Sequence, residues 1–450
     1  MMVEVNHDLC RGPDFLVEEP VGKNSRPTVF VDAFAGCGGL SLGLMQSGMD
    51  GLFAVEKDDF AFSTLKHNLI DGQGPTFSWP SWLKPKPYAI EDLLVEYHTE
   101  LTELRGEVDV LAGGPPCQGF SSAGRRRADD PRNRLFKSYL ELVSLIEPRV
   151  VLMENVRGFT MSFGGQEGVD NYAASLRDLL SDRYHVHERL LDLARFGVPQ
   201  HRTRYFLIAL HPDLGHVDPF SIIDDCLAGF LRRLRLQVPV SSWSAISDLE
   251  IGRVGTQPCS ESPGFLETCP GPRITAYQKM MGQDVEEVAD LRLARHSEEI
   301  ARRFGEIIDL CHSQGRLNTS ISAETRQHYG LKKMALRVLD PDRPAPTITS
   351  MPDDLLHYSE PRTLTVRENA RLQSFPDWFA FKGKYTTGGE RRRREVPRFT
   401  QVANAVPPLA ARAIGEGLLA IIAAAQSEPN LALEPTRQGL VEKPELVPEF

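Results

Sequence analysis

Short apolar runs alternate with stretches of helical pattern between residues 28 and 210, and this alternation constrains the fold more than any other feature of the sequence. Each run is rich in valine, leucine, isoleucine or phenylalanine and is short, which is typical of a buried strand. Strands that alternate with helices form a mostly parallel sheet with helices on both faces. The sequence therefore predicts an α/β fold with a doubly wound, mostly parallel sheet, whose strands are residues 28–34, 51–55, 108–112, 150–153 and 205–209.

The alternation is lost between residues 211 and 335, which predicts a second, smaller domain of irregular build. Regular patterns return toward the C-terminus. Thr365 and Glu368 have the spacing of a capping box that opens a short helix. The small and apolar residues 409–425 predict a well-packed helix with proline at its start.

These patterns divide the chain into four parts. A larger α/β domain comprises residues 28–210 together with 400–425, and the smaller domain comprises residues 211–399. The first 27 residues carry little pattern and are expected to form a loosely held arm. The last part, residues 426–450, contains several prolines and glutamates and is expected to be disordered.

The composition, 41% hydrophobic and 25% charged, is that of an ordinary soluble globular protein. No apolar run approaches the roughly 18 residues of a membrane span, and the N-terminus is acidic where a signal peptide is basic. The seven cysteines lack any Cys-x-x-Cys pair, which fits a reducing cytoplasm and predicts no metal site. A net charge of −10 disfavours a nucleic-acid partner on average, but binding depends on where the basic residues cluster.

A glycine-rich turn at residues 35–39 joins the first predicted strand to a helix. Backbone N–H groups at such a turn face an anionic group, and the glycine spacing suits a carboxylate rather than a pyrophosphate. Glu56 ends the second strand, about 20 residues beyond the turn, where an acid binds ribose hydroxyls. Together they predict an adenosine-bearing cofactor. In a weaker copy of the pattern, Asp92 lies either at the end of an additional short strand, ahead of residues 108–112, or at a helix cap.

Cys117 follows the third strand on a loop that is stiffened by Pro115 and Pro116. A lone cysteine is usually a small buried hydrophobe. A structural cysteine needs no Gly-Gly-Pro-Pro sequence in front of it, and reactive groups collect beyond the strand ends of open α/β sheets. The loop therefore favours a reactive thiol at Cys117.

Three charged residues stand at the ends of later strands. Glu154 follows the fourth strand, where its carboxylate is expected across the same pocket as Cys117, although it also fits a helix cap. Arg202 and Arg204 occupy alternate positions at the start of the next strand, although most arginines are simply surface charges.

Two basic runs stand out in a chain of negative net charge. Arg125, Arg126 and Arg127 lie in the loop behind Cys117, and residues 391–394 are four consecutive arginines. Such a run is either a solvated surface tract or a contact for phosphates. The position of residues 391–394 between the two predicted domains favours the second interpretation.

The sequence Gly-Pro-Pro-Cys-Gln-Gly-Phe-Ser at residues 114–121 resembles the nucleophile motif of the cytosine-5 DNA methyltransferases of bacterial type. The resemblance spans residues 28–210 and 337–418, and the motifs occur in the order usual for that family. One departure is Ala403, where the family usually has glycine. The neighbouring Asn404 and the two prolines that follow are in place, so the departure is minor.

The resemblance implies a class I methyltransferase fold in which the larger domain is catalytic and the smaller one is a target-recognition domain. Cys117 would then attack the cytosine, Glu154 would contact the edge of the base, and Arg202 and Arg204 would support the flipped nucleotide. Residues 211–335 would choose the DNA sequence. The implied cofactor is S-adenosylmethionine, bound by Phe34, Ala35, Gly36, Gly38, Gly39, Leu40, Glu56, Lys57, Asp92, Pro115 and Asn404.

Double-stranded DNA is the implied partner, with a restriction endonuclease of the same specificity as a companion, and a cytoplasmic, DNA-associated monomer is expected. The implied DNA-binding residues are Ser121, Arg125, Arg126, Arg127, Arg391, Arg392, Arg393 and Arg394.

The sequence also leaves three alternative functions to compare with methyl transfer to DNA. A tRNA methyltransferase of the same family usually has a short recognition segment, whereas residues 211–335 are long enough to read a groove. A catalytically silent DNA-binding relative has no need of intact Cys117, Glu154 and Glu56. An unrelated cysteine hydrolase needs a histidine base, for which His201 is the one candidate within a motif, and it leaves the adenosine site unexplained. Methyl transfer to DNA is therefore favoured.

Overall fold

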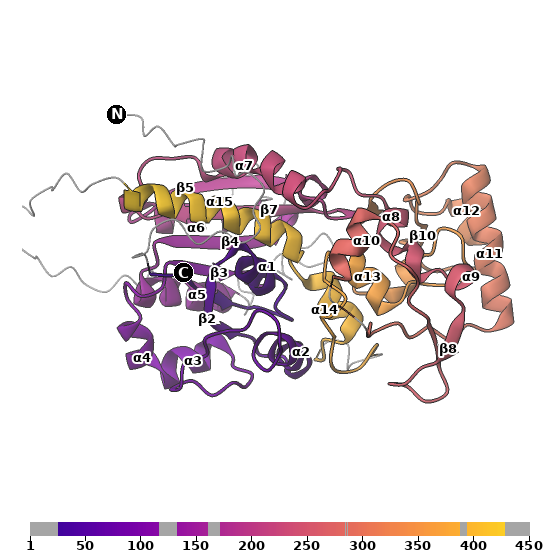
Figure 1. Cartoon of the computed structure of the whole chain (residues 1–450), viewed down its shortest axis with the longest axis horizontal. Coiled ribbons are helices and arrows are strands. Elements are labelled where there is room, and N and C mark those ends of the chain that lie inside the picture. The colour runs from indigo at the N-terminus through magenta and orange to yellow at the C-terminus, as the bar shows by residue number, and fades with distance from the viewer. Residues whose placement is uncertain are drawn as a thin grey trace, which may run out of the picture.

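The computed structural model describes residues 26–116, 133–160, 172–283, 285, 287–387 and 394–427, and they form two lobes (Figure 1). The larger lobe is built around a twisted sheet, and the smaller lobe consists of short helices and strands. Except for Arg26 and Pro27, the predicted N-terminal arm lies outside the described residues, as does the predicted tail beyond Ser427.

Six strands form the central sheet: β1 (Val29–Ala33), β2 (Asp50–Val55), β3 (Val110–Gly113), β4 (Val150–Val156), β5 (His185–Asp192) and β7 (Thr203–Leu210). Their order is β2-β1-β3-β4-β7-β5. Pairing is parallel between β1 and β2, β1 and β3, and β3 and β4, whereas β7 is antiparallel to both of its neighbours. The predicted mostly parallel sheet is therefore confirmed, with β7 as the exception.

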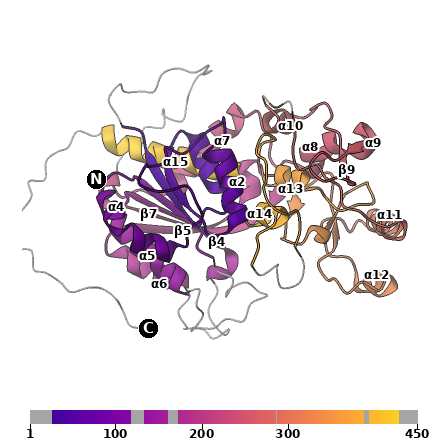
Figure 2. The same cartoon turned by 90° about the horizontal axis from the view of Figure 1, so that it is seen from below.

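Successive side chains along each strand enter two different apolar cores, one on each face of the sheet. Phe30 and Leu152 belong to one core, and their neighbours Val31 and Val151 belong to the other. The first face is covered by α1 (Gly39–Ser47), α2 (Asp59–Leu69), α7 (Pro219–Arg233) and α15 (Pro408–Ser427). The second face is covered by α3 (Ile90–Glu96), α4 (His98–Glu103), α5 (Asn133–Ile146) and α6 (Tyr172–Ser181), as Figure 2 shows.

Helix α15 crosses the first face of the sheet and contacts α1 closely. A Cβ atom on Gly43 of α1 would lie 2.3 Å from the carbonyl oxygen of Pro408 and 2.4 Å from the Cβ of Ala411, so only glycine permits this approach. By length and composition alone, the helical stretch 398–427 is apolar enough to cross a membrane. However, 61% of its most apolar window is buried inside the protein, so we assign it to the core.

Helix α7 belongs to the larger lobe, although it follows residue 211. It packs against α15 and β5 with its apolar face, which includes Phe220 and Phe230. Arg189 of β5 pairs with Asp224 of α7 at 2.9 Å. The chain therefore leaves the larger lobe after α7, later than the boundary expected from the sequence.

The smaller lobe has the irregular build that the sequence predicted. Its helices are α8 (Ser242–Ile246), α9 (Ile251–Val254), α10 (Ala276–Met281), α11 (Glu298–Ser313), α12 (Ala323–His328), α13 (Val366–Leu372) and α14 (Arg398–Asn404). Its strands are the hairpin of β8 (Thr256–Pro258) and β9 (Leu266–Thr268), and the pair of β10 (Arg337–Val338) and β12 (Leu355–Leu356). A short pairing of β6 (Gln200–His201) with β11 (Ala345–Pro346) joins the two lobes. Single helical turns are η2 (Arg157–Thr160), η4 (Leu193–Phe196), η5 (Pro212–Leu214), η6 (Ser247–Leu249) and η7 (Pro352–Asp354).

Two local predictions have opposite outcomes. The capping box at Thr365 and Glu368 is confirmed, because each side chain accepts a hydrogen bond from the backbone N–H of the other residue at the start of α13. The additional strand that was predicted to end at Asp92 is wrong, because Ile90–Glu96 forms α3 and Asp92 lies in its first turn. Apolar Ile90, Leu93 and Leu94 are buried by this helix, which explains the apolar signal without a strand.

The contact between α1 and α15 predicts a large effect of one methyl group. Gly43→Ala should destabilise the protein by about 1–3 kcal/mol, because the backbone of Pro408 cannot move aside as a flexible side chain can. The urea midpoint of unfolding measures this effect. The control is Gly305→Ala in α11, where the added Cβ meets Pro361 at an ordinary 3.9 Å. That variant should gain about 0.5–1 kcal/mol from better helix propensity, and a loss equal to that of Gly43→Ala would contradict the explanation.

Candidate active site

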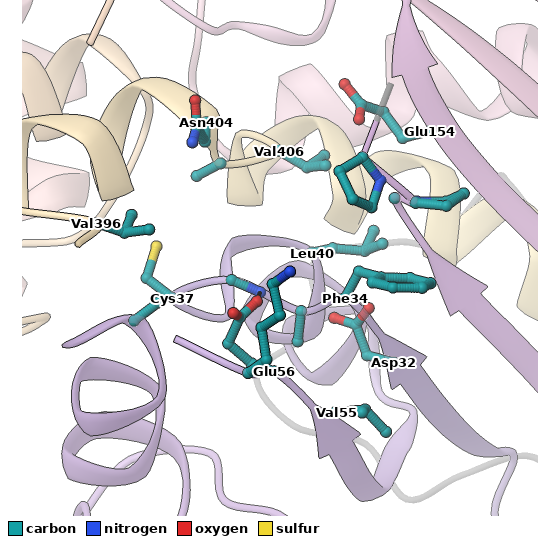
Figure 3. Close-up of a pocket in the computed structure, with 18 of the residues that line it drawn as sticks. Asp32, Phe34, Cys37, Leu40, Val55, Glu56, Glu154, Val396, Asn404 and Val406 are labelled. Carbon is teal, nitrogen blue, oxygen red and sulfur yellow. Dashed lines mark hydrogen bonds between the residues drawn. The ribbon is translucent and has the colours of Figure 1, made fainter. Parts of the chain in front are cut away.

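A cavity of about 350 Å³ lies at the carboxyl ends of β1, β2, β3 and β4, where ligands bind in open α/β sheets (Figure 3). It is lined by the turn after β1, by Pro115 and Pro116 beyond the end of β3, and by residues from α14. Most of the predicted site residues that the structure describes meet here, namely Phe34, Ala35, Gly36, Leu40, Glu56, Lys57, Pro115, Glu154, Arg202, Arg204 and Asn404.

The turn after β1 is held by Glu56, which lies at the end of β2. One carboxylate oxygen of Glu56 accepts a hydrogen bond from the backbone N–H of Gly36 at 3.0 Å, and the other accepts one from Asp58 N–H at 2.7 Å. Phe34 has a φ of 62° and Gly36 a φ of 59°, so the backbone is left-handed at both positions. Such a conformation is strained for phenylalanine, and strain of this kind collects at ligand sites. Burial raises the pKa of Glu56.

Three predicted cofactor residues are placed differently from the rest. Gly38 and Gly39 do not line the cavity but support the turn from behind, since a Cβ on Gly38 would lie 2.7 Å from the Leu69 side chain. Asp92 is exposed in the first turn of α3, and the nearby residues that line the cavity are Ile90 and Glu91.

Asp32 is a cavity residue that the sequence interpretation did not include among the site residues. Its carboxylate is buried at the end of β1 and accepts a hydrogen bond from Ser41 Oγ at 2.5 Å, while Oδ1 has no hydrogen-bond partner. Burial raises the pKa of Asp32 to about 7. The signal that could have identified Asp32 is an acidic residue within an apolar strand shortly before a glycine turn. Gln401, Val396 and Val406 also line the cavity.

The other end of the cavity contains a buried ion pair. Arg204 Nε of β7 lies 3.0 Å from Glu154 Oε1 of β4, and both side chains are largely buried. Burial raises the pKa of Glu154, in spite of the opposing effect of Arg204 and Arg202. A neutral Glu154 carboxyl can therefore donate a hydrogen bond as well as accept one. Glu154 faces arginines rather than a helix end, which is contrary to the helix-cap alternative.

Arg202 is fully buried, which excludes the alternative of a surface charge. Its Nη2 donates a hydrogen bond to the carbonyl oxygen of Ala405 at 3.1 Å. Its Nε and Nη1 are buried and have no hydrogen-bond partner. Buried donors without partners are costly, and at the wall of a cavity they are available to a ligand. The asparagine after Glu154 also contributes, since Asn155 Nδ2 donates to the carbonyl oxygen of Pro115 at 3.1 Å and so fixes the start of the cysteine loop.

Several predicted residues lie outside the described part of the chain. They are Cys117, Ser121, Arg125, Arg126, Arg127, Arg391, Arg392 and Arg393. Arg394 is described and exposed, and Val396, shortly after it, lines the cavity. Ala403, the departure from the usual glycine, fits as a buried residue of α14 at the cavity wall.

The geometry therefore brings two sets of groups together in one cavity. A strained glycine turn and two carboxylates form one end, and Glu154, whose pKa burial raises, forms the other end together with two arginines. The first end suits a ligand with hydroxyl and charged groups, and the second suits a flat polar ring with both donors and acceptors.

Comparison with known proteins gives consistent matches over most of the chain. A family model described as C-5 cytosine-specific DNA methylase matches residues 28–420. The type II methyltransferase M.DdeI of Desulfomicrobium norvegicum is 30% identical over 398 residues, which cover 86% of this chain and 87% of that protein. M.AgeI of Thalassovita gelatinovora, also named a type II methyltransferase, is 30% identical over 449 residues, which cover 86% and 98% of the two chains.

A solved structure shares the fold. The crystal structure of a protein encoded within an E. coli prophage matches with a TM-score of 0.60 at 24% sequence identity. The match covers 88% of this chain and 99% of that one. The arrangement of sheet and helices in Figure 1 is thus shared over nearly the whole length of both proteins.

The raised pKa of Asp32 predicts a pH-dependent stability. The folded protein holds a proton that the unfolded chain releases, so stability should fall as the pH rises from 3.8 to about 7. Asp32→Asn cannot ionise and keeps an acceptor for Ser41. The free energy of unfolding of this variant, relative to that of the parent, should increase by up to about 1.4 kcal/mol per pH unit in this window. Above the window, the difference should stay constant.

Urea unfolding at several pH values between about 5 and 8 measures the difference. The control is Asp178→Asn, because the Asp178 side chain is 78% exposed. The stability of this variant should follow that of the parent at every pH. A parent-like slope for Asp32→Asn would contradict the assignment.

Proposed function

The chain belongs to the C-5 cytosine-specific DNA methylase family, and from this premise we propose how it methylates cytosine in DNA. A methyl group passes from S-adenosylmethionine to C5 of a cytosine that is flipped out of the duplex. The observation that carries the proposal is the cavity in which Glu154, Arg204 and the unpaired donors of Arg202 lie opposite the glycine turn and Glu56.

The residues around the glycine turn fit S-adenosylmethionine. Glu56 is suited to bond the ribose hydroxyls, and the unpartnered Oδ1 of Asp32 offers an acceptor inside the same cavity. Phe34, Leu40, Pro115 and Asn404 supply wall contacts, and Lys57 supplies a positive charge. When bound, the cofactor supplies an electrophilic methyl group. We assign the exposed Asp92 no more than an indirect role through α3.

Cys117 is proposed as the nucleophile. C5 of cytosine is a poor nucleophile because the ring is aromatic and electron-poor. When the thiolate adds to C6, a carbon–sulfur bond forms and the electron pair of the C5–C6 double bond makes C5 reactive toward the methyl group. After methylation, loss of the C5 proton restores the double bond and expels the thiolate.

The charged end of the cavity assists this addition. Thiolate attack places negative charge on N3 and O2 of the ring, and a protonated Glu154 donates to N3 while Arg202 donates to O2. Arg204 holds the Glu154 carboxyl in place through the 3.0 Å ion pair. A carbon inside the stacked duplex cannot reach a thiol on a protein loop, so the base must leave the helix first.

The biological setting follows from the relatives, which are named type II methyltransferases. We propose that residues 211–335 choose a short DNA sequence, and that a restriction endonuclease recognises the same sequence. The protein is then a cytoplasmic monomer that acts on chromosomal DNA. Bisulfite sequencing of DNA from cells that express it identifies the methylated sequence.

The nucleophile is tested by substitution and by trapping. Cys117→Ser should abolish methylation and retain S-adenosylmethionine binding in calorimetry, because the residues at the glycine turn are unchanged. The parent should form a covalent complex with DNA that carries 5-fluorocytosine at the target, because fluorine cannot leave as a proton does. Active parent protein that forms no such complex would refute the covalent mechanism.

The control for trapping is Cys37, whose side chain lines the cavity. Cys37 is buried, its Sγ lies 3.7 Å from the carbonyl oxygen of Gln401, and burial raises its pKa to about 12. Cys37→Ser should therefore still form the trapped complex. Labelled methyl transfer to tRNA but not to DNA would instead support the tRNA alternative.

The arginine run 391–394 is proposed to contact DNA phosphates, because it shortly precedes Val396 at the cavity wall. Replacing all four with glutamine should weaken binding to every DNA sequence alike. The slope of log K against log salt should flatten by roughly 1 for each lost contact, because fewer counterions are released. The control replaces Arg177 and Arg183, which are exposed near α6 and pair with Glu188 and Glu147. Equal slopes for the two variants would contradict the phosphate contacts and support the alternative that residues 391–394 are a solvated surface tract.

A further inference from the structure

The smaller lobe contributes two carboxylates to the first residue of α14. Arg398 Nη1 lies 2.6 Å from Glu261 Oε2 and 2.8 Å from Asp290 Oδ1. The Asp290 side chain is fully buried, so its pair with Arg398 is shielded from solvent, whereas the Glu261 side chain is 36% exposed. Both acids belong to residues 211–335, the segment to which we assign the choice of DNA sequence.

Helix α14 connects this ion pair to both ends of the cavity. Gln401, Ala403 and Asn404 of α14 line the cavity. The residue after the helix, Ala405, provides the carbonyl oxygen that accepts the hydrogen bond from Arg202 at 3.1 Å. A displacement of α14 therefore moves cavity residues at the cofactor end and also the partner of a buried arginine at the base end.

The far side of α14 is fixed to the larger lobe. Thr64 Oγ1 of α2, in the larger lobe, donates to Gln401 Oε1 at 2.6 Å. On the side of the smaller lobe, Gln401 Nε2 donates to the carbonyl oxygens of Lys382 and Val396. The short helix is thus held from two sides, by the larger lobe at Gln401 and by the smaller lobe at Arg398.

Glu261 is itself held rigidly in the turn of the β8–β9 hairpin. Tyr385 Oη donates to Glu261 Oε2 at 3.0 Å, and the Tyr385 ring lies 4.2 Å from the Arg398 guanidinium. The guanidinium of Arg292 lies 3.6 Å from the same ring and 4.3 Å from the Phe265 ring of the hairpin. Stacking between a guanidinium and an aromatic ring adds to the rigidity of this contact.

We propose that Glu261 and Asp290 are positioning residues for the catalytic cavity. They hold Arg398, fix α14, and thereby set the positions of Asn404 and of the carbonyl group that binds Arg202. The recognition segment therefore completes the cofactor site in addition to choosing the sequence. The proposal rests on the proposed function in assigning S-adenosylmethionine to the cavity and sequence choice to residues 211–335.

Glu261 is the better test position, because Asp290 also accepts hydrogen bonds from Arg367 and from the backbone N–H of Phe381, so its replacement removes more than the contact with Arg398. Glu261→Gln keeps the shape of the side chain and removes its charge. The dissociation constant for S-adenosylmethionine, measured by calorimetry without DNA, should rise about five- to tenfold, as expected for a lost charge-assisted hydrogen bond. The methylated DNA sequence should remain the same, and the melting temperature should stay near that of the parent.

Two further variants make the test specific. Glu267→Gln lies in the same hairpin, where Glu267 accepts a hydrogen bond from Gln257 at 3.0 Å, and it should bind the cofactor as the parent does. Tyr385→Phe keeps the ring on Arg398 and removes only the hydroxyl bonded to Glu261. It should weaken cofactor binding in the same direction by a smaller factor, which keeps the test open if Glu261→Gln fails to fold.

The outcomes separate this inference from the proposed function. Unchanged cofactor affinity in folded Glu261→Gln, or equal losses in Glu261→Gln and Glu267→Gln, would overturn the positioning role even if the parent methylates DNA. Failure of the parent to methylate DNA would overturn the proposed function, whereas the cofactor measurements would still decide the role of Glu261.

Discussion

Antiparallel pairing of β7 with β4 brings Arg204 beside Glu154, and the charged half of the cavity depends on this pairing. The register aligns Glu154 with Phe206 and Val156 with Arg204, so the two charged side chains lie diagonally across adjacent strands. A buried charge without a partner is strongly destabilising. The pair therefore makes it possible to keep a carboxyl group buried at the cavity wall, where its raised pKa suits a proton donor. The donors of Arg202, left unpaired in the same place, are available where negative charge develops on a bound base.

The smaller lobe uses buried ion pairs in a different way. One apolar cluster of this lobe, around α11, is small, while Phe375, Phe379 and Phe381 belong to the large core that continues from the sheet. Arginines also bind carboxylates in the interior of the lobe. Arg371 contacts both Asp248 and Asp377, and Arg362 makes a bidentate contact with Glu368 at 2.7 and 2.8 Å. Such pairs add little net stability compared with apolar packing, but their geometry is fixed. We infer that they give an irregular lobe a defined shape that its short helices and strands do not supply.

The limits of prediction from the sequence follow from burial. Strands β1 to β4 were predicted because they are buried on both faces and so appear as continuous apolar runs. Strand β5 was not predicted, because histidine, glutamate and arginine interrupt its apolar residues, so no continuous apolar run appears in the sequence. Residues 90–93 gave a false strand signal, because three apolar residues on one face of α3 resemble a short buried run.

The meeting of the candidate residues in one cavity was easier to predict than the packing of the helices. Glu56, Glu154 and Arg202 were expected to lie close together because each is a polar residue next to an apolar strand, and the sheet brings such positions to one edge, where all three line the cavity. The packing of α7 against α15 and β5 was not expected from a boundary at residue 211, since the amphipathic pattern of α7 fits either lobe. Contacts of this kind depend on residues far apart in the sequence, and no local pattern encodes them.

Helix α14 shows why recognition and catalysis cannot be fully separate in this fold. Its first residue is held by carboxylates of the smaller lobe, and its last turn lines the cavity between the two lobes. A change of DNA specificity that alters the hairpin of β8 and β9 must therefore preserve the carboxylate at Glu261, or the cavity loses one of its supports. The buried part of the same contact, between Arg398 and Asp290, resists a displacement of α14 from the rest of the smaller lobe, because it would remove one of the two arginine partners of a buried carboxylate.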